Sequence, residues 1–277
     1  MDIAPINAPA VNIDATSLSE MSSWLSAKTT AGKVLVVIAN QDFFFQEYAD
    51  PKTALESQGF TVEVASGLGT PSTPHAGTGQ SSEPGTVTPN FSISAVDHSA
   101  YQGLVIAGGY GASQYYFGYK SDHASNTITA QSYYDPSPAA GATALNALIG
   151  DFLAAGKPIL GVCNGVNVLS WARVNGVSPL SGKTVSAPYL SVPAQTYRGT
   201  SYTSDSLECL IAGSCLPMKT FAEHNGAIVR LRNSVGNTSS SSDDVSVDGL
   251  ILTAQDNDSA TEGGQKLAEK ILTWVRE

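Results

Sequence analysis

A cysteine between two glycines is the residue of this sequence with the clearest chemical potential. Residues 161–165 read Gly-Val-Cys-Asn-Gly, between an apolar run at 158–162 and a helical pattern at 166–175. This is the G-x-nucleophile-x-G pattern of a sharp strand-to-helix turn. The helix start directs unpaired N–H groups and the positive end of its dipole toward the sulfur. The pattern predicts an exposed thiol at Cys163 with a lowered pKa; a buried, inert cysteine is the alternative.

Strands and helices alternate along most of the chain, and this alternation predicts an α/β fold. Short apolar runs predict buried strands, and apolar residues at helical spacing predict helices. The predicted strands are 33–39, 60–65, 103–107, 158–162 and 247–254, and the predicted helices are 48–59, 142–155, 166–175 and 266–277. We expect a flavodoxin-like, doubly wound, mostly parallel sheet between layers of helices.

Three candidate features fall at one rim of that sheet. In doubly wound folds, ligands bind beyond the carboxyl ends of the strands. Glu47 follows the first predicted strand, the glycine pair 108–109 follows the third, and Cys163 follows the fourth. Three separate loops thus converge on one edge, which supports a site there more strongly than the cysteine motif alone.

The predicted domain is preceded and interrupted by irregular segments. Residues 1–30 are expected to form an irregular leader and residues 31–277 a single domain. Segments rich in glycine, serine, proline or tyrosine predict long insertions. These insertions are expected at about 66–96, 110–138 and 190–245.

Two of the insertions have further features. The one at 110–138 is rich in tyrosine, which suggests a lid or a pocket wall; its tyrosines include Tyr110, Tyr115, Tyr116, Tyr119 and Tyr133. In the last insertion we predict short strands at 220–224 and 227–232, and a mobile loop at 237–244.

The charge of the chain limits its partners. The formal net charge of −10 argues against nucleic acid and anionic membrane surfaces, which both attract basic proteins. No apolar run approaches the roughly 20 residues of a membrane span. Residues 1–30 lack the basic start and apolar stretch of a signal peptide. The location is therefore left open between the cytoplasm and an exported or periplasmic protein whose signal peptide is absent from this sequence.

Two further cysteines lie six residues apart. Cys209 and Cys215 flank a loop-like stretch with a glycine. A local disulfide would fit an oxidising compartment, and two reduced thiols are the equal alternative. Neither the spacing nor a nearby histidine indicates zinc.

The sequence resembles the ThiJ/PfpI family, within the class I glutamine-amidotransferase-like superfamily. The resemblance covers most of residues 33–277 and follows the order of the family's motifs. The matching segments are KVLVVIAN at 33–40, EYADP at 47–51, YQGLVIAGG at 101–109, GKPILGVCNG at 156–165 and DGLILTAQDNDSA at 248–260. It implies the fold more specifically than it implies the reaction.

The resemblance also implies roles for the rim residues. The Glu47 carboxyl would approach the Cys163 sulfur, share a hydrogen bond with it and move a proton. The backbone N–H groups of Gly109, beside Gly108, and of Asn164 would form an oxyanion pocket. The alternatives are a solvated glutamate in the first turn of a helix and a plain tight turn at the glycines.

The sequence departs from the family at the residue after the cysteine. Active branches often have histidine there, whereas this chain has Asn164, which cannot relay protons. The histidine-x-glutamate motif of glutamine amidotransferases is also missing from the 248–260 segment. His224 and His123 are therefore candidates for a base supplied from elsewhere, against a surface or structural role for each.

Three functions follow from these residues. The first is a cofactor-independent hydrolase or lyase of a small carbonyl, amide or related electrophile, resembling glyoxalases, deglycases or amidases. The second is a redox-responsive or chaperone-like protein that uses an oxidisable Cys163. The third is a degenerate binding module. Relatives are often dimers, so the resemblance carries the expectation of a homodimer, with a small molecule as the other partner.

Overall fold

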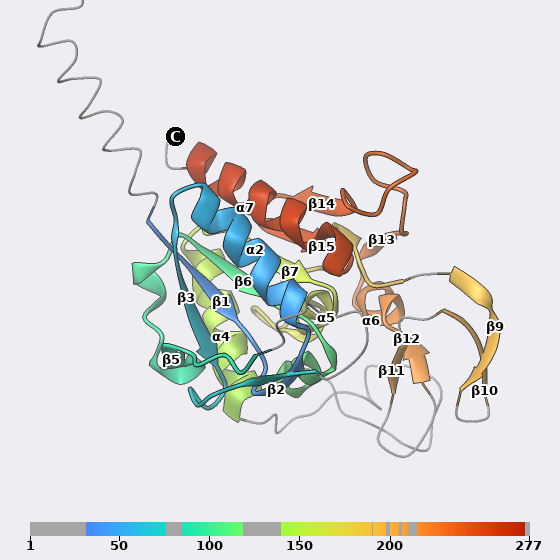
Figure 1. Cartoon of the computed structure of the whole chain (residues 1–277), viewed down its shortest axis with the longest axis horizontal. Helices are drawn as coiled ribbons and strands as arrows, with labels where there is room; N and C mark the ends of the chain where they lie inside the picture. Colours follow the sequence, from blue (N-terminus) through green and yellow to red (C-terminus); the bar gives the residue numbers. More distant parts are fainter. Residues whose placement is uncertain are drawn as a thin grey trace, which may run out of the picture.

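A seven-stranded sheet forms the centre of the molecule in a computed structural model, which describes residues 32–75, 85–118, 140–189, 191–197, 200–204, 207–209 and 215–274. The strand order is β14-β15-β7-β6-β1-β3-β5 (Figure 1). All neighbouring strands run parallel except β14 and β15, so the predicted, mostly parallel sheet is confirmed. The strands are β1 (Lys33–Val37), β3 (Thr61–Ser66), β5 (Phe91–Ser92), β6 (Gly103–Ile106), β7 (Ile159–Val162), β14 (Val245–Asp248) and β15 (Ile251–Ala254).

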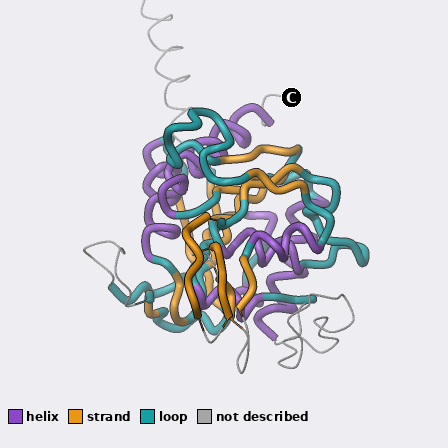
Figure 2. Tube along the Cα trace, turned by 90° about the vertical axis from the view of Figure 1, so that its right-hand side faces the viewer, coloured by secondary structure: helices purple, strands orange, loops and turns teal. Residues whose placement is uncertain are grey.

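Helices cover both faces of this sheet. Helix α2 packs along α7 on one face, and α4 and α5 lie against β7 on the other (Figures 1 and 2). The winding outward from β1 in both directions gives the flavodoxin-like order and places a crevice between the ends of β1 and β6. The helices are α2 (Phe45–Ser57), α4 (Ala140–Ala154), α5 (Asn164–Trp171), α6 (Lys219–His224) and α7 (Ala260–Trp274).

The two helical layers explain the unbroken apolar runs of the strands. Every residue of β6, β7 and β15 is buried, and in β1 only Lys33 is exposed. A parallel strand covered on both faces has no solvent side, so its sequence is continuously apolar instead of alternating. The site is therefore built on strand ends that the core holds rigidly.

The last predicted strand, 247–254, is wrong in its extent. It is a hairpin in which Asp248 pairs with Ile251, and the intervening turn begins at Gly249 with a φ of 66°. A positive φ is accessible to glycine at no steric cost. The apolar residues on both sides of this turn made two strands look like one.

The final helix begins earlier than predicted. It starts at Ala260, after a short 3₁₀ turn that Asp256 caps in a capping box with Ser259. The cap satisfies N–H groups that the helix start leaves without partners. The chain therefore turns sharply beyond β15 and places Asp256 at the carboxyl edge of the sheet.

Short elements make up the insertions. The predicted strand at 220–224 is wrong, because these residues belong to α6, whose Phe221 and Ala222 are buried. The strand predicted at 227–232 is confirmed as β13. The short pairs are β2 (Gln41–Phe43) with β4 (Thr73–Pro74), β8 (Thr184–Ser186) with β13 (Ile228–Arg230), β9 (Ser191–Tyr197) with β10 (Thr200–Ser204) and β11 (Leu207–Cys209) with β12 (Cys215–Pro217).

Four 3₁₀ turns complete the described elements. The segment 66–96, predicted to have little regular structure, contributes β4, β5 and one of these turns. In the last insertion, two hydrogen bonds stabilise the loop at 237–244 that was predicted to be mobile. Asn237 N donates to Asp243, and Asn233 N donates to Asp244. The turns are η1 (Ile93–Ala95), η2 (His98–Ala100), η3 (Tyr110–Tyr115) and η4 (Asn257–Ser259).

Several predictions fall outside the described residues. These are the leader at 1–30, Tyr119, Tyr133 and His123. The division into a leader and one domain therefore stays a prediction. None of the helices in the described ranges combines the length and apolar character needed to cross a bilayer.

Candidate active site

Cys163 occupies the sharp turn between β7 and α5. Its φ of 51° and ψ of −120° lie in a region that residues with a side chain rarely adopt. Two backbone hydrogen bonds hold it there: Cys163 N donates to Ala254 O at 2.9 Å, and Val166 N donates to Cys163 O at 2.9 Å. The residue is partly exposed. The sheet thus enforces the strained turn that the motif predicts.

Glu47 lies in the first turn of α2 and is almost fully buried, with 2% of its surface exposed. The pKa of its carboxyl is raised from 4.5 to about 8, mainly by burial and in smaller part by the charge of Asp256. The Cys163 thiol and the N–H groups of Gly109 and Gly108 partly offset this rise. Its Oε2 atom meets the geometry of a hydrogen bond with no group of the described residues. Glu47 is therefore a carboxyl that holds its proton near neutral pH, as a proton-transfer group requires.

Cys163 does not have the lowered pKa that the helix start predicts. Burial raises the pKa of the thiol well above its ordinary value, and the charges of Glu47 and Asp256 raise it further. The N–H group of Asn164 lowers it, but this contribution is the smallest. The prediction was wrong because the thiol is buried and the charges of carboxyls from two other elements act on it, and the 161–165 motif shows neither effect.

The thiol and the carboxyl form one titrating unit. The thiol and the carboxyl are hydrogen-bonded to each other, so they titrate together. After the pair has lost one proton, the proton that remains is shared between Cys163 and Glu47. One form is a thiol beside a carboxylate; the other is a thiolate beside a protonated carboxyl. The nucleophilic form therefore arises by proton transfer within the pair.

The glycine turn after β6, at Gly108 and Gly109, lies in close contact with the start of α2 and with the turn that holds Cys163. A Cβ atom on Gly108 would lie 2.4 Å from Glu47 Oε2, and one on Gly109 would lie 2.3 Å from Phe44 N. Gly109 also has a φ of 86°. Only glycine permits this approach. The predicted oxyanion donors are thus at the site, and in this structure Gly109 N–H faces Glu47 while Asn164 N–H faces the sulfur.

The side chain of Asn164 holds the two turns together. It is fully buried, and its Nδ2 donates to Gly109 O at 2.9 Å. Its Oδ1 accepts from Tyr116 Oη at 2.5 Å and from Asn167 Nδ2 at 3.0 Å. Asn164 therefore connects the glycine turn to the strand-to-helix turn at Cys163, which we call the elbow. Tyr116, predicted as a pocket wall, contributes to this connection.

His224 lies at the far end of the helix that begins beside Cys163. Its ring centroid is 5.8 Å from that of Trp171, the last residue of α5. Burial and the neighbouring Arg173 lower its pKa. Eight residues of helix correspond to about 12 Å along the axis, so these contacts place His224 well away from the sulfur. Its role as a base for Cys163 stays a prediction.

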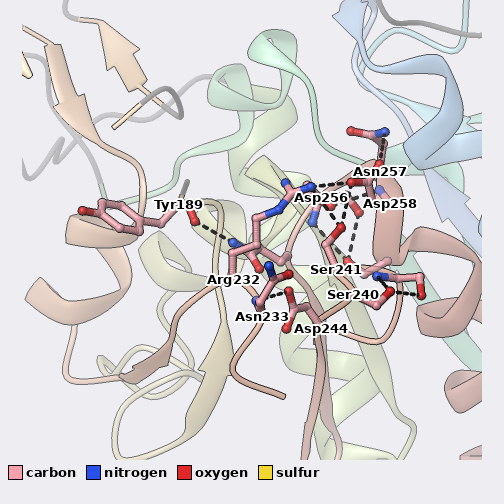
Figure 3. A network of polar contacts seen from close by, with 12 residues as sticks. Tyr189, Arg232, Asn233, Ser240, Ser241, Asp244, Asp256, Asn257 and Asp258 are labelled. Atoms are coloured by element: carbon pink, nitrogen blue, oxygen red, sulfur yellow. Dashed lines mark hydrogen bonds and ion pairs between the residues drawn. The ribbon is translucent and has the colours of Figure 1, made fainter. Parts of the chain in front are cut away.

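Sequence reasoning missed Asp256, the second carboxyl beside the pair. It is largely buried, and burial raises its pKa while the charge of Arg232 lowers it. Figure 3 shows Arg232 between Asp256 and Asp258, with an ion pair to each. The position of Asp256 directly after the last buried strand was a signal that could have found it, since strand ends meet at one rim.

An open groove of about 660 Å³ lies beside the glycine turn. It is formed where the ends of β1, β3 and β6 meet, at the crevice expected for a ligand in this topology. Its lining includes Asn40, Asp42, Leu68, Tyr110, Ser113 and Gln114. Tyr110, predicted as a pocket wall, is one of these residues.

Cys209 and Cys215 are the two remaining cysteines of the chain. Cys209 and Cys215 face each other in the register of β11 and β12. Their side chains are outside the described part of the structure, so the disulfide stays a prediction. Within the described ranges, no three histidine, cysteine, aspartate or glutamate side chains gather as a metal site would require.

Comparison by sequence finds no match: no family model and no curated protein resembles the chain closely enough. Comparison by structure finds many. A ThiJ/PfpI domain protein from Brachyspira murdochii has a TM-score of 0.57 at 17% identity and covers 87% of this chain and 96% of its own. Glyoxalase III from Candida albicans has a TM-score of 0.56 at 17% identity, over 88% and 98% of the two chains. Drosophila melanogaster DJ-1beta has a TM-score of 0.53 at 17% identity and covers 87% of this chain and 90% of its own.

These neighbours share their fold with this chain over almost their whole length. The resemblance to the ThiJ/PfpI family inferred from the motifs is thereby confirmed at the level of the fold. Identities of 15% to 19% across the similar structures do not carry an activity from one protein to another.

Proposed function

We propose that this chain, which has the fold of the ThiJ/PfpI domain proteins, is a cofactor-independent cysteine hydrolase or lyase of a small electrophile. The observation that carries the proposal is the hydrogen-bonded pair of Cys163 and Glu47, in which a buried carboxyl with a pKa of about 8 lies beside the thiol of a partly exposed residue in a strained backbone turn. Such a pair supplies a nucleophile and a proton carrier without any other group.

The proposed first step is addition of the sulfur to a carbonyl carbon. In the pair that has lost one proton, the Glu47 carboxylate takes the thiol proton, the Cys163 sulfur forms a bond to carbon, and the electron pair of the C=O π bond moves to oxygen. Glu47 then returns the proton to that oxygen or, with an amide or ester, to the leaving group. The N–H groups of Gly109 and Asn164 are the proposed donors to the developing negative charge.

The class of substrate follows from the same geometry. A nucleophile held on a turn between a buried strand and a buried helix is reached by a small carbonyl compound more readily than by a bulky one. One of the similar structures is named glyoxalase III. We therefore place small dicarbonyl compounds first among the substrates and simple amides and esters second.

Turnover of a substrate panel tests this proposal. Wild-type protein should convert at least one member of a panel of methylglyoxal, related dicarbonyls, and small amides and esters. Cys163→Ser should lose the activity by about 10³-fold or more, because the hydroxyl is a far weaker nucleophile. His224→Gln, in the same assay, tests the remaining prediction of a distant base. A wild-type protein that converts nothing on the panel, or a Cys163→Ser variant that stays active, would contradict the proposal.

A second function is favoured by one feature of the pair. A carboxyl that keeps its proton to about pH 8 can donate a hydrogen bond to an oxidised sulfur. We propose redox sensing as the alternative, with chaperone-like activity or plain binding behind it. Mild peroxide should then add oxygen to Cys163 before the other two cysteines, as peptide mass spectrometry would show. Equal oxidation of all three cysteines would remove this alternative.

A further inference from the structure

Asp256 shares the rim of the sheet with the proposed nucleophile. Strands β15 and β7 are parallel neighbours, with Ala254 opposite Val162. Cys163 and Asp256 each lie just beyond these paired residues, and Cys163 N donates to Ala254 O. The 3₁₀ turn η4 that Asp256 caps packs against α2, the helix that carries Glu47. Asp256 thus approaches both members of the pair from a separate element.

The carboxyl of Asp256 is held in one position by groups on several sides. Arg232 Nη1 donates to its Oδ2, and the backbone N–H of Asp258 donates to its Oδ1 at 3.0 Å. Arg232 Nη2 in turn donates to Asp258 Oδ2 at 2.5 Å and to Ser241 Oγ at 3.0 Å (Figure 3). A carboxylate with charge-assisted and capping bonds has little freedom to turn away.

The charge of this carboxylate acts on the pair. It raises the pKa of both Glu47 and Cys163. Arg232 opposes burial and keeps the pKa of Asp256 from rising further, whereas Asp258 raises it. Among the described residues, the groups that act on the pKa of the sulfur are therefore Glu47 from α2, Asp256 from the start of η4, and the N–H group of Asn164 at the start of α5.

We infer that Asp256, with Arg232 as its counter-charge, is a positioning residue that sets the pH at which Cys163 becomes nucleophilic. Arg232 holds the Asp256 carboxylate in place and offsets part of its charge, and the remaining negative charge delays loss of a proton from the pair of Glu47 and Cys163. This inference rests on the proposed function, because it concerns the same thiol. It adds a third element, remote in sequence, to the control of that thiol.

The experiment measures the rate of iodoacetamide alkylation of Cys163 against pH, followed on the peptide that contains it. Asp256→Asn should lower the midpoint of this profile by about half a pH unit or more, because a negative charge near the sulfur is removed. Asparagine and serine both cap helices, so Asp256→Asn and Asp256→Ser keep the start of α7. Asp258→Asn is the matched control. It removes a carboxylate that also binds Arg232, and it should move the midpoint by less than about 0.2 units, because Asp258 has no direct effect on the pair.

A variant that leaves the cap untouched gives an independent arm. Arg232→Met should raise the midpoint, because it removes the positive charge that offsets the negative charge of Asp256. Thermal unfolding of each variant verifies that it is folded. Unchanged midpoints in the folded Asp256 and Arg232 variants would overturn the inference and leave the proposed function standing. A wild-type Cys163 that resists alkylation at every pH would overturn both.

Discussion

At the scale of single residues, the site is governed by one proton and the groups that compete for it. Burial raises the pKa of both Glu47 and Cys163, and the carboxyl raises the pKa of the thiol further, whereas the hydrogen bond of the thiol lowers the pKa of the carboxyl. Neither the raised pKa of the carboxyl nor the raised pKa of the thiol would by itself produce a reactive thiol. Together they allow the proton to move from sulfur to carboxyl without leaving the site, so the nucleophile forms with little net change of charge.

Replacing Glu47 separates the acidity of the thiol from its usefulness. In Glu47→Gln the negative neighbour of Cys163 is gone, so the midpoint of alkylation should move to lower pH. Turnover should nevertheless fall by about 10²- to 10⁴-fold, because the amide cannot carry the proton. Alkylation profiles and steady-state rates on the same preparations measure the two quantities. If turnover rose together with thiolate formation, Glu47 would have only an electrostatic effect.

Asn164 shows where residue-level prediction from sequence was limited. The cysteine motif, Glu47 and the glycine pair were all identified as parts of the site from their places after predicted strands, and the structure does bring them together. From the sequence, we considered Asn164 only as a replacement for the histidine that follows the cysteine in active branches of the family. Its side chain instead contacts Gly109 and Tyr116, whose distance in sequence hides the contact.

At the scale of elements, the site depends on how closely three loops approach one another. The turn at Gly108 and Gly109 passes so near the start of α2 that no side chain fits between them. The elbow at Cys163 is attached to β15 by a backbone hydrogen bond. Small changes in any of these turns should therefore reach the chemistry, because a misplacement of about 1 Å is costly to catalysis.

Substitution of Gly109 should show the cost of this close packing. In Gly109→Ala the new Cβ would lie 2.3 Å from Phe44 N at a φ of 86°, so we expect a loss of more than about 2 kcal/mol in the free energy of unfolding. Gly176→Ala is the matched control. Gly176 has a similar φ of 80°, but a Cβ added there would meet no atom within 4 Å, so it should lose about 1 kcal/mol from backbone strain alone. Equal losses in urea unfolding would show that crowding at the site is unimportant.

Elements with a simple sequence pattern were predicted well, and elements defined by turns were not. The runs at β1, β6 and β7 are continuously apolar because both faces are covered, so their position was readable. The hairpin of β14 and β15 has the same composition as one strand, and only Gly249 marks the turn. Asp256 was missed for a related reason, since the capping turn that positions it follows this hairpin.

At the scale of the whole molecule, the buried carboxyl should make stability depend on pH. A carboxyl whose pKa is raised in the folded state keeps its proton while the unfolded chain releases it. Glu47 has an ordinary pKa of 4.5 and a folded value of about 8, so stability from this group is complete below pH 4.5 and is lost as the pH rises toward 8. Asp256 and Asp50, also with raised pKa values, act in the same direction.

Unfolding in urea at pH 5, 7 and 9 tests this dependence. We expect the free energy of unfolding of the wild type to fall over this range by several kcal/mol, since each pKa unit corresponds to about 1.4 kcal/mol. Glu47→Gln should reduce most of the slope, whatever its effect at a single pH. Glu56→Gln, an exposed residue of the same helix that pairs with Lys52, should keep it. A Glu47→Gln slope equal to that of the wild type would mean that Glu47 is ionised in the folded protein at neutral pH. The pKa of its carboxyl would then not be raised by burial.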